Sequence, residues 1–169
     1  VGGCASATKS RTMQPTVDVN RLSDLEFTHY LASAPIAMVD EGLRAVLLLT
    51  GDSTRWPDFH SRRDELIRRG AFKRNWSLPP NSLLDRGTLA YMLRSTCRLK
   101  RGANEVIFGS VGFGDRRYAL HTCIYEGILP PGRATDTVTG GELLNAITLA
   151  QQHNDAKTTR TTKCVAGPF

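Results

Sequence analysis

Residue types that often carry catalysis are present, but they do not form a recognisable catalytic set. The four histidines are scattered and share no metal-ligand spacing: His29, His60, His121 and His153. No stretch matches a serine-hydrolase elbow, a zinc-protease motif or a phosphate-binding loop. The glycine-rich segment 109–114 lacks the residue order of such a loop, and we interpret it as a connector. An enzyme needs a nucleophile, a base and charge-stabilising donors that converge, so the sequence predicts a non-catalytic protein without metal or cofactor.

Positive charge is the more informative chemical feature. The formal net charge is +6, and basic residues gather in two stretches, 62–74 and 94–101. A basic face favours polyanions such as nucleic acid, anionic lipid or acidic cell-wall polymers. The same charges also fit a solvated helix face, partly neutralised by Asp64 and Glu65. Aromatic residues lie among the basic ones only in 72–76, where we interpret Trp76, like Trp56, as a hydrophobic anchor.

The cysteines Cys97 and Cys123 lie in apolar helical patterns. No pair of cysteines in the chain has the C-x-x-C spacing of a zinc or redox site. A free cysteine in an apolar pattern usually behaves as a small hydrophobic residue, so we expect both to be buried. A disulfide between them in an oxidising compartment is the alternative.

The chain begins with one aliphatic and two small residues, Val1, Gly2 and Gly3, which directly precede Cys4. This pattern resembles a bacterial lipobox, which implies that Cys4 carries a diacylglyceryl group and tethers the protein to a membrane. Several acyl chains together give stable anchoring where a single chain does not. The alternative is a small-residue tail with an incidental cysteine. Residues 5–12 are small and polar, which is typical of a flexible tether.

Helical periodicity and capping signals predict a mainly α-helical domain. Ser23 and Glu26 have the spacing of a capping box, and the helix that follows must end before Pro35. Further helices are expected at about 40–50, 57–69, 85–96, 115–126 and 139–152, with a short strand at 105–108. Gly70 and Gly127 have the position of C-terminal helix caps. We therefore expect a tether at 1–16, a helical domain at 17–153 and a disordered Thr-rich tail at 154–169.

One sequence pattern recurs along the domain. The stretches that begin at Asp40, Asp85 and Thr139 each have a capping residue, a glycine two positions later and then helix-period apolar residues. Segment 66–70 also matches 123–127. The chain is therefore predicted to be built from helix–loop–helix repeats that bury their apolar faces against one another in a compact bundle or array.

The order of a helix, a turn that ends in glycine, a proline-containing loop and a capped helix resembles the S-layer homology module. The best match covers 118–130 and 138–144, a second covers 66–70 and 84–90, and the resemblance extends over about 40–152. In that family an arginine near the start of the capped helix helps to bind acidic cell-wall polysaccharide. Here Arg86 has that place, and Glu41 and Gly140 stand at the other two.

The sequence therefore favours a structural or adaptor lipoprotein of the bacterial cell envelope. The resemblances imply a lipid anchor in a membrane and, as partner, another envelope protein or an acidic polysaccharide. Oligomers are compatible with this hypothesis. The alternative is a basic nucleic-acid-binding module of the cytoplasm, which charge alone supports weakly. Five arginines are the candidates for contact with an acidic partner: Arg62, Arg63, Arg86, Arg94 and Arg98.

Overall fold

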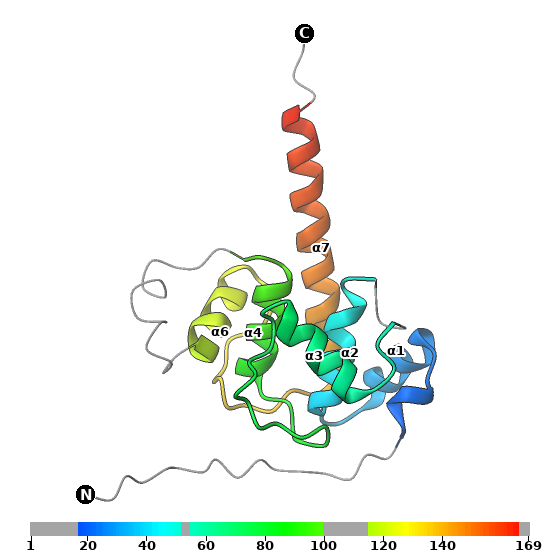
Figure 1. Cartoon of the computed structure of the whole chain (residues 1–169). Coiled ribbons are helices and arrows are strands. Elements are labelled where there is room, and N and C mark those ends of the chain that lie inside the picture. Colours follow the sequence, from blue (N-terminus) through cyan, green and yellow to red (C-terminus); the bar gives the residue numbers. More distant parts are fainter. Residues whose placement is uncertain (1–16, 52–54, 100–114, 166–169) are drawn as a thin grey trace, which may run out of the picture.

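The computed structural model describes residues 17–51, 55–99 and 115–165, with the side chains of the last helix described as far as residue 157. The fold is mainly α-helical and compact, as predicted (Figure 1). The elements are η1 (Val19–Arg21), α1 (Asp24–Ser33), α2 (Val39–Leu48), α3 (Phe59–Arg68), α4 (Arg86–Thr96), α6 (Asp115–Tyr125) and α7 (Gly140–Val165). The strand expected at 105–108 lies outside the described residues.

Local capping signals place most helix ends where the sequence predicts them. Ser23 Oγ accepts a hydrogen bond from the backbone N–H of Glu26, and the Glu26 carboxylate accepts one from the N–H of Ser23 at 2.8 Å. This capping box satisfies two of the N–H groups that a helix start leaves without partners. Gly70 and Gly127 both have φ near +70°, a conformation that side chains with a Cβ disfavour. The two glycines therefore end α3 and α6 as predicted.

The start of α2 differs from the sequence prediction. Its capping residue is Met38, whereas Asp40 lies within the first helical turn. The Glu41 carboxylate accepts a hydrogen bond from the N–H of Met38 at 2.8 Å, so the helix needs no capping hydroxyl. The repeat alignment that placed Asp40 opposite Asp85 was therefore wrong by two residues. In the corrected register Val39, rather than Glu41, corresponds to Arg86.

The last helix also extends beyond its predicted end. α7 runs from Gly140 to Val165, so the prediction of a disordered tail from residue 154 was wrong for the part of the chain that the structure describes. Side chains tie this extension to the end of α4. The amide of Asn154 contacts Cys97 Sγ at 3.6 Å, and Lys157 Nζ donates to the Cys97 carbonyl at 3.4 Å. Beyond these contacts the helix projects from the body of the molecule (Figure 1).

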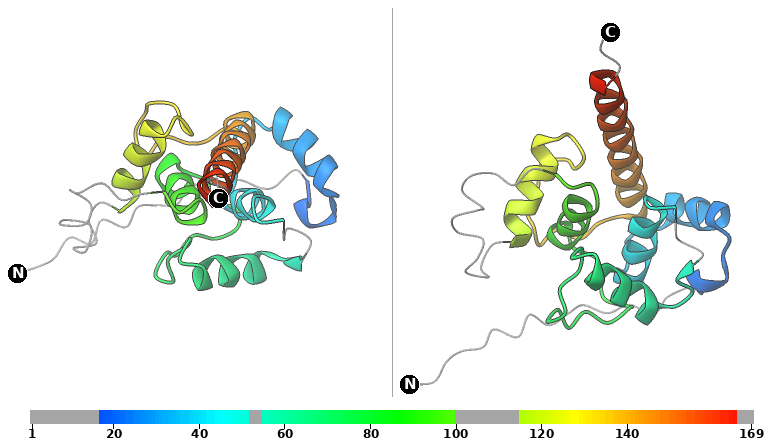
Figure 2. Two further views of the ribbon diagram at one scale, coloured as in Figure 1. Left: turned by 90° about the horizontal axis from the view of Figure 1, so that it is seen from above. Right: turned by 45° about the horizontal axis from the view of Figure 1, so that its top comes forward.

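The helices form three helix–loop–helix units, namely α1 with α2, α3 with α4, and α6 with α7. Viewed from above, the inner helices α2, α4 and α7 lie at the centre, and the outer helices α1, α3 and α6 surround them (Figure 2, left). Each outer helix packs on the inner helix of the preceding unit: α3 on α2, and α6 on α4. α1 in turn packs on α7, so the first unit closes against the third.

Three backbone hydrogen bonds join the units at the centre. The N–H of Ala37 donates to the carbonyl of Val138 at 2.7 Å, that of Val138 to Leu84 at 2.9 Å, and that of Leu84 to Ala37 at 2.9 Å. Each residue directly precedes the capping residue of its inner helix, so the three positions are equivalent. The bonds form a closed ring that passes once through each unit.

The hydrophobic core lies between the inner helices. Its fully buried side chains include Leu43, Leu47, Leu89, Met92, Leu93 and Leu143. Burial of one such side chain contributes about 1.5–3 kcal/mol relative to exposure, so these residues stabilise the contact between units. Leu66 and Phe72, at the end of α3 and just after it, belong to the same core. They fix α3 and the loop that follows it against the inner helices.

Candidate anion-binding groove

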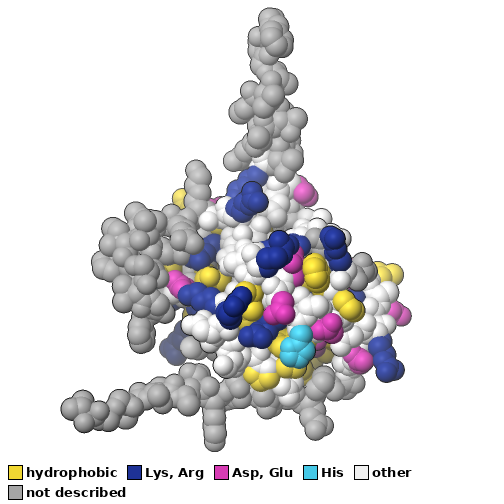
Figure 3. All heavy atoms as spheres, viewed as in Figure 1, with side chains coloured by type: hydrophobic (Ala, Val, Ile, Leu, Met, Phe, Trp, Pro, Cys, Tyr) yellow, Lys and Arg dark blue, Asp and Glu magenta, His cyan; other side chains and the backbone are white. Residues whose placement is uncertain are grey.

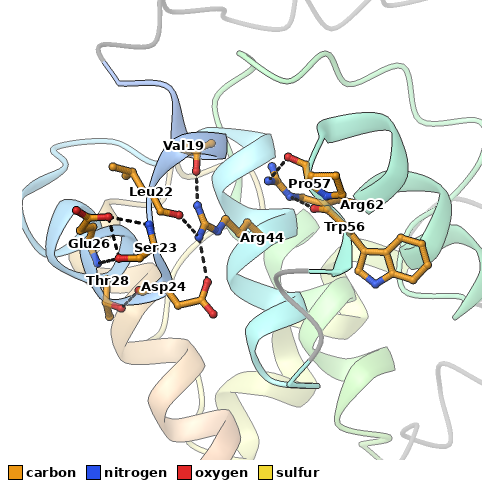
Figure 4. A network of polar contacts seen from close by, with 10 residues as sticks. All are labelled: Val19, Leu22, Ser23, Asp24, Glu26, Thr28, Arg44, Trp56, Pro57 and Arg62. Atoms are coloured by element: carbon orange, nitrogen blue, oxygen red, sulfur yellow. Dashed lines mark hydrogen bonds and ion pairs between the residues drawn. The ribbon is translucent and has the colours of Figure 1, made fainter.

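Arg62 does not reach the surface, although the sequence made it a candidate for partner binding. The side chain is 2% exposed and donates to Asp40 Oδ1 at 2.8 Å. It also donates to the carbonyl oxygens of Trp56 and Pro57, each at 2.9 Å (Figure 4). Buried charges require this degree of pairing because their desolvation is costly. Arg62 is therefore a structural residue that joins α3 to α2, and the prediction of a binding role is corrected.

Arg44 of α2 is likewise a buried arginine whose partners lie inside the protein. Its guanidinium lies 4.4 Å from the centre of the Phe27 ring and donates to the carbonyl of Leu22 at 2.7 Å and to Asp24 at 2.9 Å. It also donates to the carbonyl of Val19 (Figure 4). This role of Arg44 could not be predicted from the sequence, because the residue lies in a stretch with the pattern of an ordinary amphipathic helix.

Two other candidate arginines also have structural partners. Arg94 is 4% exposed, and its guanidinium lies 5.2 Å from the centre of the Tyr91 ring. Arg86 forms an ion pair with Glu142 and donates to the Pro131 carbonyl at 3.0 Å, so it links the second unit to the third. Burial removes Arg94 from contact with a partner, and the ion pair occupies Arg86. Of the five candidates, Arg63 and Arg98 remain accessible.

Arg63 lies between two adjoining depressions on the surface of α3 and the loop that follows it. One depression, of about 430 Å³, is lined by Arg63, Asp64, Ile67, Arg68 and Arg74. The other, of about 300 Å³, is lined by Phe59, Arg63, Trp76, Ser77, Leu78 and Pro79. We call the two together the α3 groove. It has a basic half and an aromatic half, and Arg63 belongs to both.

The charge of the basic half comes chiefly from two arginines. Arg63 Nη2 donates to the Arg74 carbonyl at 3.4 Å, and in the described part of the chain neither side chain lies within ion-pair distance of a carboxylate. Arg68 differs, because it forms two hydrogen bonds to Glu65, at 2.8 and 2.6 Å. Arg68 and then Arg69 lower the pKa of Glu65 to about 2, although desolvation of this carboxyl opposes the shift. Arg63 and Arg74 therefore remain available to an anion.

The surface over α3 shows this mixture of charge and apolar side chains. Lys and Arg side chains lie beside hydrophobic ones on the face seen in Figure 3, with Asp and Glu between them. Phe59 and Trp76 supply the aromatic rings of the groove. The sequence contained a signal for this site, the basic and aromatic stretch 72–76, but that stretch was interpreted as packing. Trp76 is partly exposed: it packs against the core and also lines the groove.

Other predicted features have varied outcomes. Cys97 and Cys123 are buried free thiols, as expected, and burial raises the pKa of Cys123 to about 12. His153 lies 3.0 Å from Glu126, which ties α7 to the end of α6.

In the described ranges no group of His, Cys, Asp or Glu side chains could hold a metal ion, and no helix there is long and apolar enough to cross a bilayer. Cys4 lies outside the described residues.

Within the described residues, the α3 groove is thus a site with the geometry to bind a ligand. An anion would meet the guanidinium groups of Arg63 and Arg74, and a flat apolar group would meet Phe59 and Trp76. Searches against protein-family models, curated proteins and solved structures find no match for this chain.

Proposed function

We propose that this chain is a non-catalytic adaptor of the bacterial cell envelope that binds an acidic polymer or an acidic protein segment in the α3 groove. The observation that carries the proposal is the pair Arg63 and Arg74, which form no ion pair within the described residues and lie beside an aromatic half-groove, with Asp64 as the one unpaired acidic residue in the lining. Arginine binds carboxylate and phosphate groups through its planar fork of donors. Charge near an aromatic surface would let the groove select an anion attached to a ring or an apolar group.

The envelope location rests on sequence resemblances. The lipobox-like start supports a lipid on Cys4, and the recurring capped-helix pattern of the sequence supports S-layer homology-like repeats. The place of the family's ligand-binding arginine corresponds to Val39, Arg86 and Gly140 in the corrected register, and Arg86 is held by Glu142. This departure favours the α3 groove over the family position as the binding site of this chain.

A binding measurement with polygalacturonate, an acidic polysaccharide of defined chemistry, tests the proposal. Arg63→Glu and Arg74→Glu should each weaken binding by about tenfold, since each replaces an attraction by a repulsion worth at least about 1.4 kcal/mol. Arg117→Glu is the matched control, because Arg117 is exposed on α6 and lies outside the groove. Equal losses in all three variants would show that net charge, rather than the groove, controls binding.

The proposed membrane location can be tested separately from the groove. A protein with a lipid on Cys4 should partition with membranes in its native host, and Cys4→Ser should release it to the aqueous fraction. The intact mass of the native N-terminus reports the modification directly. An unmodified residue 1 in the mature protein would contradict the anchor without affecting the groove.

Single-stranded nucleic acid is the second candidate ligand, since arginines beside aromatic rings also bind phosphates and stack with bases. An oligothymidylate of about 20 nucleotides separates the candidates because it offers both features without base pairing. Stronger binding of this oligonucleotide than of polygalacturonate at equal ionic strength would favour the cytoplasmic alternative. The same Arg63 and Arg74 variants locate either ligand.

A further inference from the structure

Two residues of the α3 groove lie on one short turn. Arg74 lines the basic half and Trp76 lines the aromatic half, and the N–H of Trp76 donates to the Lys73 carbonyl at 3.1 Å. The position of this Lys73–Trp76 turn therefore sets the distance between a charged and an aromatic part of the groove. What holds the turn in place also determines the shape of the groove.

The start of α6 holds the turn at both of its ends. Asp115 forms an ion pair with Lys73, and the guanidinium of Arg116 lies 4.4 Å from the centre of the Trp76 ring. Arginine stacks on aromatic rings through its planar, weakly hydrated cation. Neighbouring residues of the third unit thus contact both ends of a turn that belongs to the second unit.

Arg116 is itself fixed in position. It donates to Asp85 Oδ2 at 3.1 Å, and the other oxygen of that carboxylate accepts the N–H of Thr88 at 2.6 Å as the cap of α4. Gly87 allows this approach, because a Cβ there would lie 2.9 Å from Arg116 Cβ. The glycine and the cap residue of α4 therefore place the guanidinium over the indole.

Trp76 has further aromatic neighbours. Its ring packs edge to face with Phe72 at 5.1 Å and with Tyr91 at 5.0 Å between ring centres. Lys73 Nζ also lies 5.5 Å from the centre of the Tyr91 ring. Held by two aromatic rings and a stacked cation, the indole has a fixed place in the groove wall before any ligand arrives.

We infer that Asp115 and Arg116 are positioning residues for the α3 groove: they hold Arg74 and Trp76 in the arrangement that binds an anionic ligand, and touch no ligand themselves. This inference rests on the proposed function of the groove. A preorganised site binds more tightly because it does not have to order its side chains on binding. Loss of the stack should therefore lower affinity although every groove residue is still present.

The test compares two neighbouring arginines of α6. Arg116→Gln and Arg117→Gln remove the same charge, but only Arg116 stacks on Trp76. In a Trp56→Phe background, where Trp76 is the sole tryptophan, quenching of its fluorescence by the neutral quencher acrylamide reports how firmly the ring is held. We expect Arg116→Gln to raise quenching and to weaken polygalacturonate binding by about fivefold or more, through lost preorganisation. Arg117→Gln should leave quenching unchanged.

Two further sets of variants, Arg116→Lys and an exchange of the charges of Lys73 and Asp115, distinguish lost positioning from a folding defect. Lysine keeps the charge but lacks the planar fork, so Arg116→Lys should behave more like Arg116→Gln than like the parent. Asp115→Lys should weaken binding, and the double variant Lys73→Asp with Asp115→Lys should restore it. Circular dichroism confirms that each variant remains helical before binding is measured.

The outcomes separate the two hypotheses. If the parent protein does not bind polygalacturonate or the oligonucleotide, the proposed function fails. If the parent binds but Arg116→Gln binds equally well, or loses no more affinity than Arg117→Gln, the positioning role is overturned while the groove stands. Increased quenching with unchanged affinity would also overturn it, since the Trp76 position would then not matter for binding.

Discussion

The guanidinium of Arg62 and the carboxylate of Asp40 lie 2.8 Å apart within the protein, where α3 of the second unit meets α2 of the first. The arginine is almost fully buried, and the two carbonyl oxygens of residues 56 and 57 complete its hydrogen bonds. Burial raises the pKa of Asp40, and Arg62 opposes that shift. The pair belongs to the packing between units.

Arg62→Gln should consequently lower stability rather than affect binding selectively. Removal of one partner of a buried ion pair typically costs about 3–5 kcal/mol, because the remaining charge stays buried. Arg63→Gln, a change to the neighbouring residue on the groove side, should cost less than about 0.5 kcal/mol. Urea unfolding followed by circular dichroism measures both. Similar stabilities for the two variants would contradict the structural role of Arg62.

A pair of adjacent glycines tests the closure of the ring. A Cβ on Gly140 would overlap the Leu31 carbonyl oxygen and the Ala34 side chain, where the third unit meets the first, whereas a Cβ on Gly141 would meet nothing within 4 Å. Gly140→Ala should therefore destabilise the protein by about 1–3 kcal/mol or more. Gly141→Ala should stabilise it by up to about 1 kcal/mol through helix propensity. Thermal unfolding distinguishes them, and equal midpoints would argue against the closed ring.

The Glu65 carboxylate predicts an acid-sensitive contribution to stability. Its pKa in the folded protein is about 2, below the ordinary value of 4.5, because Arg68 and Arg69 bind the ionised form. The contribution is therefore present above about pH 4.5 and is lost as the pH falls towards 2. Unfolding free energies of the parent and of Glu65→Gln should differ at pH 7 and converge near pH 2. The difference between the two proteins cancels the opposite effects of Asp40 and Glu41. A gap that does not change with pH would contradict the prediction.

The two buried thiols should be unreactive in the folded protein. Burial raises the pKa of both Cys97 and Cys123, so little thiolate forms at neutral pH, and the fold shields the sulfur atoms. The chain has two further cysteines, Cys4 and Cys164, which a Cys4→Ser, Cys164→Ser background removes. In that background a thiol reagent should label Cys97 and Cys123 in denaturant and neither of them within minutes in buffer. Absence of labelling in denaturant would instead reveal a Cys97–Cys123 disulfide.

Features of the fold that depend on neighbouring residues could be predicted from the sequence. The capping box of Ser23, the caps at Asp85 and Thr139, and the two C-terminal glycines all act within a few positions along the chain. The start of α2 escaped prediction because Met38 has no capping side chain. There the N–H groups of Val39 and Asp40 donate to the carbonyls of Ser82 and Pro80, far along the sequence.

The candidate site was predictable only in part for the same reason. Arg63 and Arg62 are neighbours in one basic run, and nothing local shows that one faces solvent and the other enters the core. The place of the Trp76 ring in the groove depends on Arg116, which belongs to another unit. The end of α7 could not be predicted from the Thr-rich composition of the tail either, because composition does not show the contacts of Asn154 and Lys157 with Cys97.

The cycle of bonds through Ala37, Leu84 and Val138 sets a limit on how this architecture can grow. In an open solenoid every terminal repeat exposes a surface on which another copy can stack, so repeats can be added one at a time. Here the N–H donor of the second and third units is already bonded to the carbonyl of the preceding unit, and the first unit donates to the third. A fourth copy would find no place in the assembly. A longer protein of this type would have to add units in sets of three, each set a separate body joined by a linker.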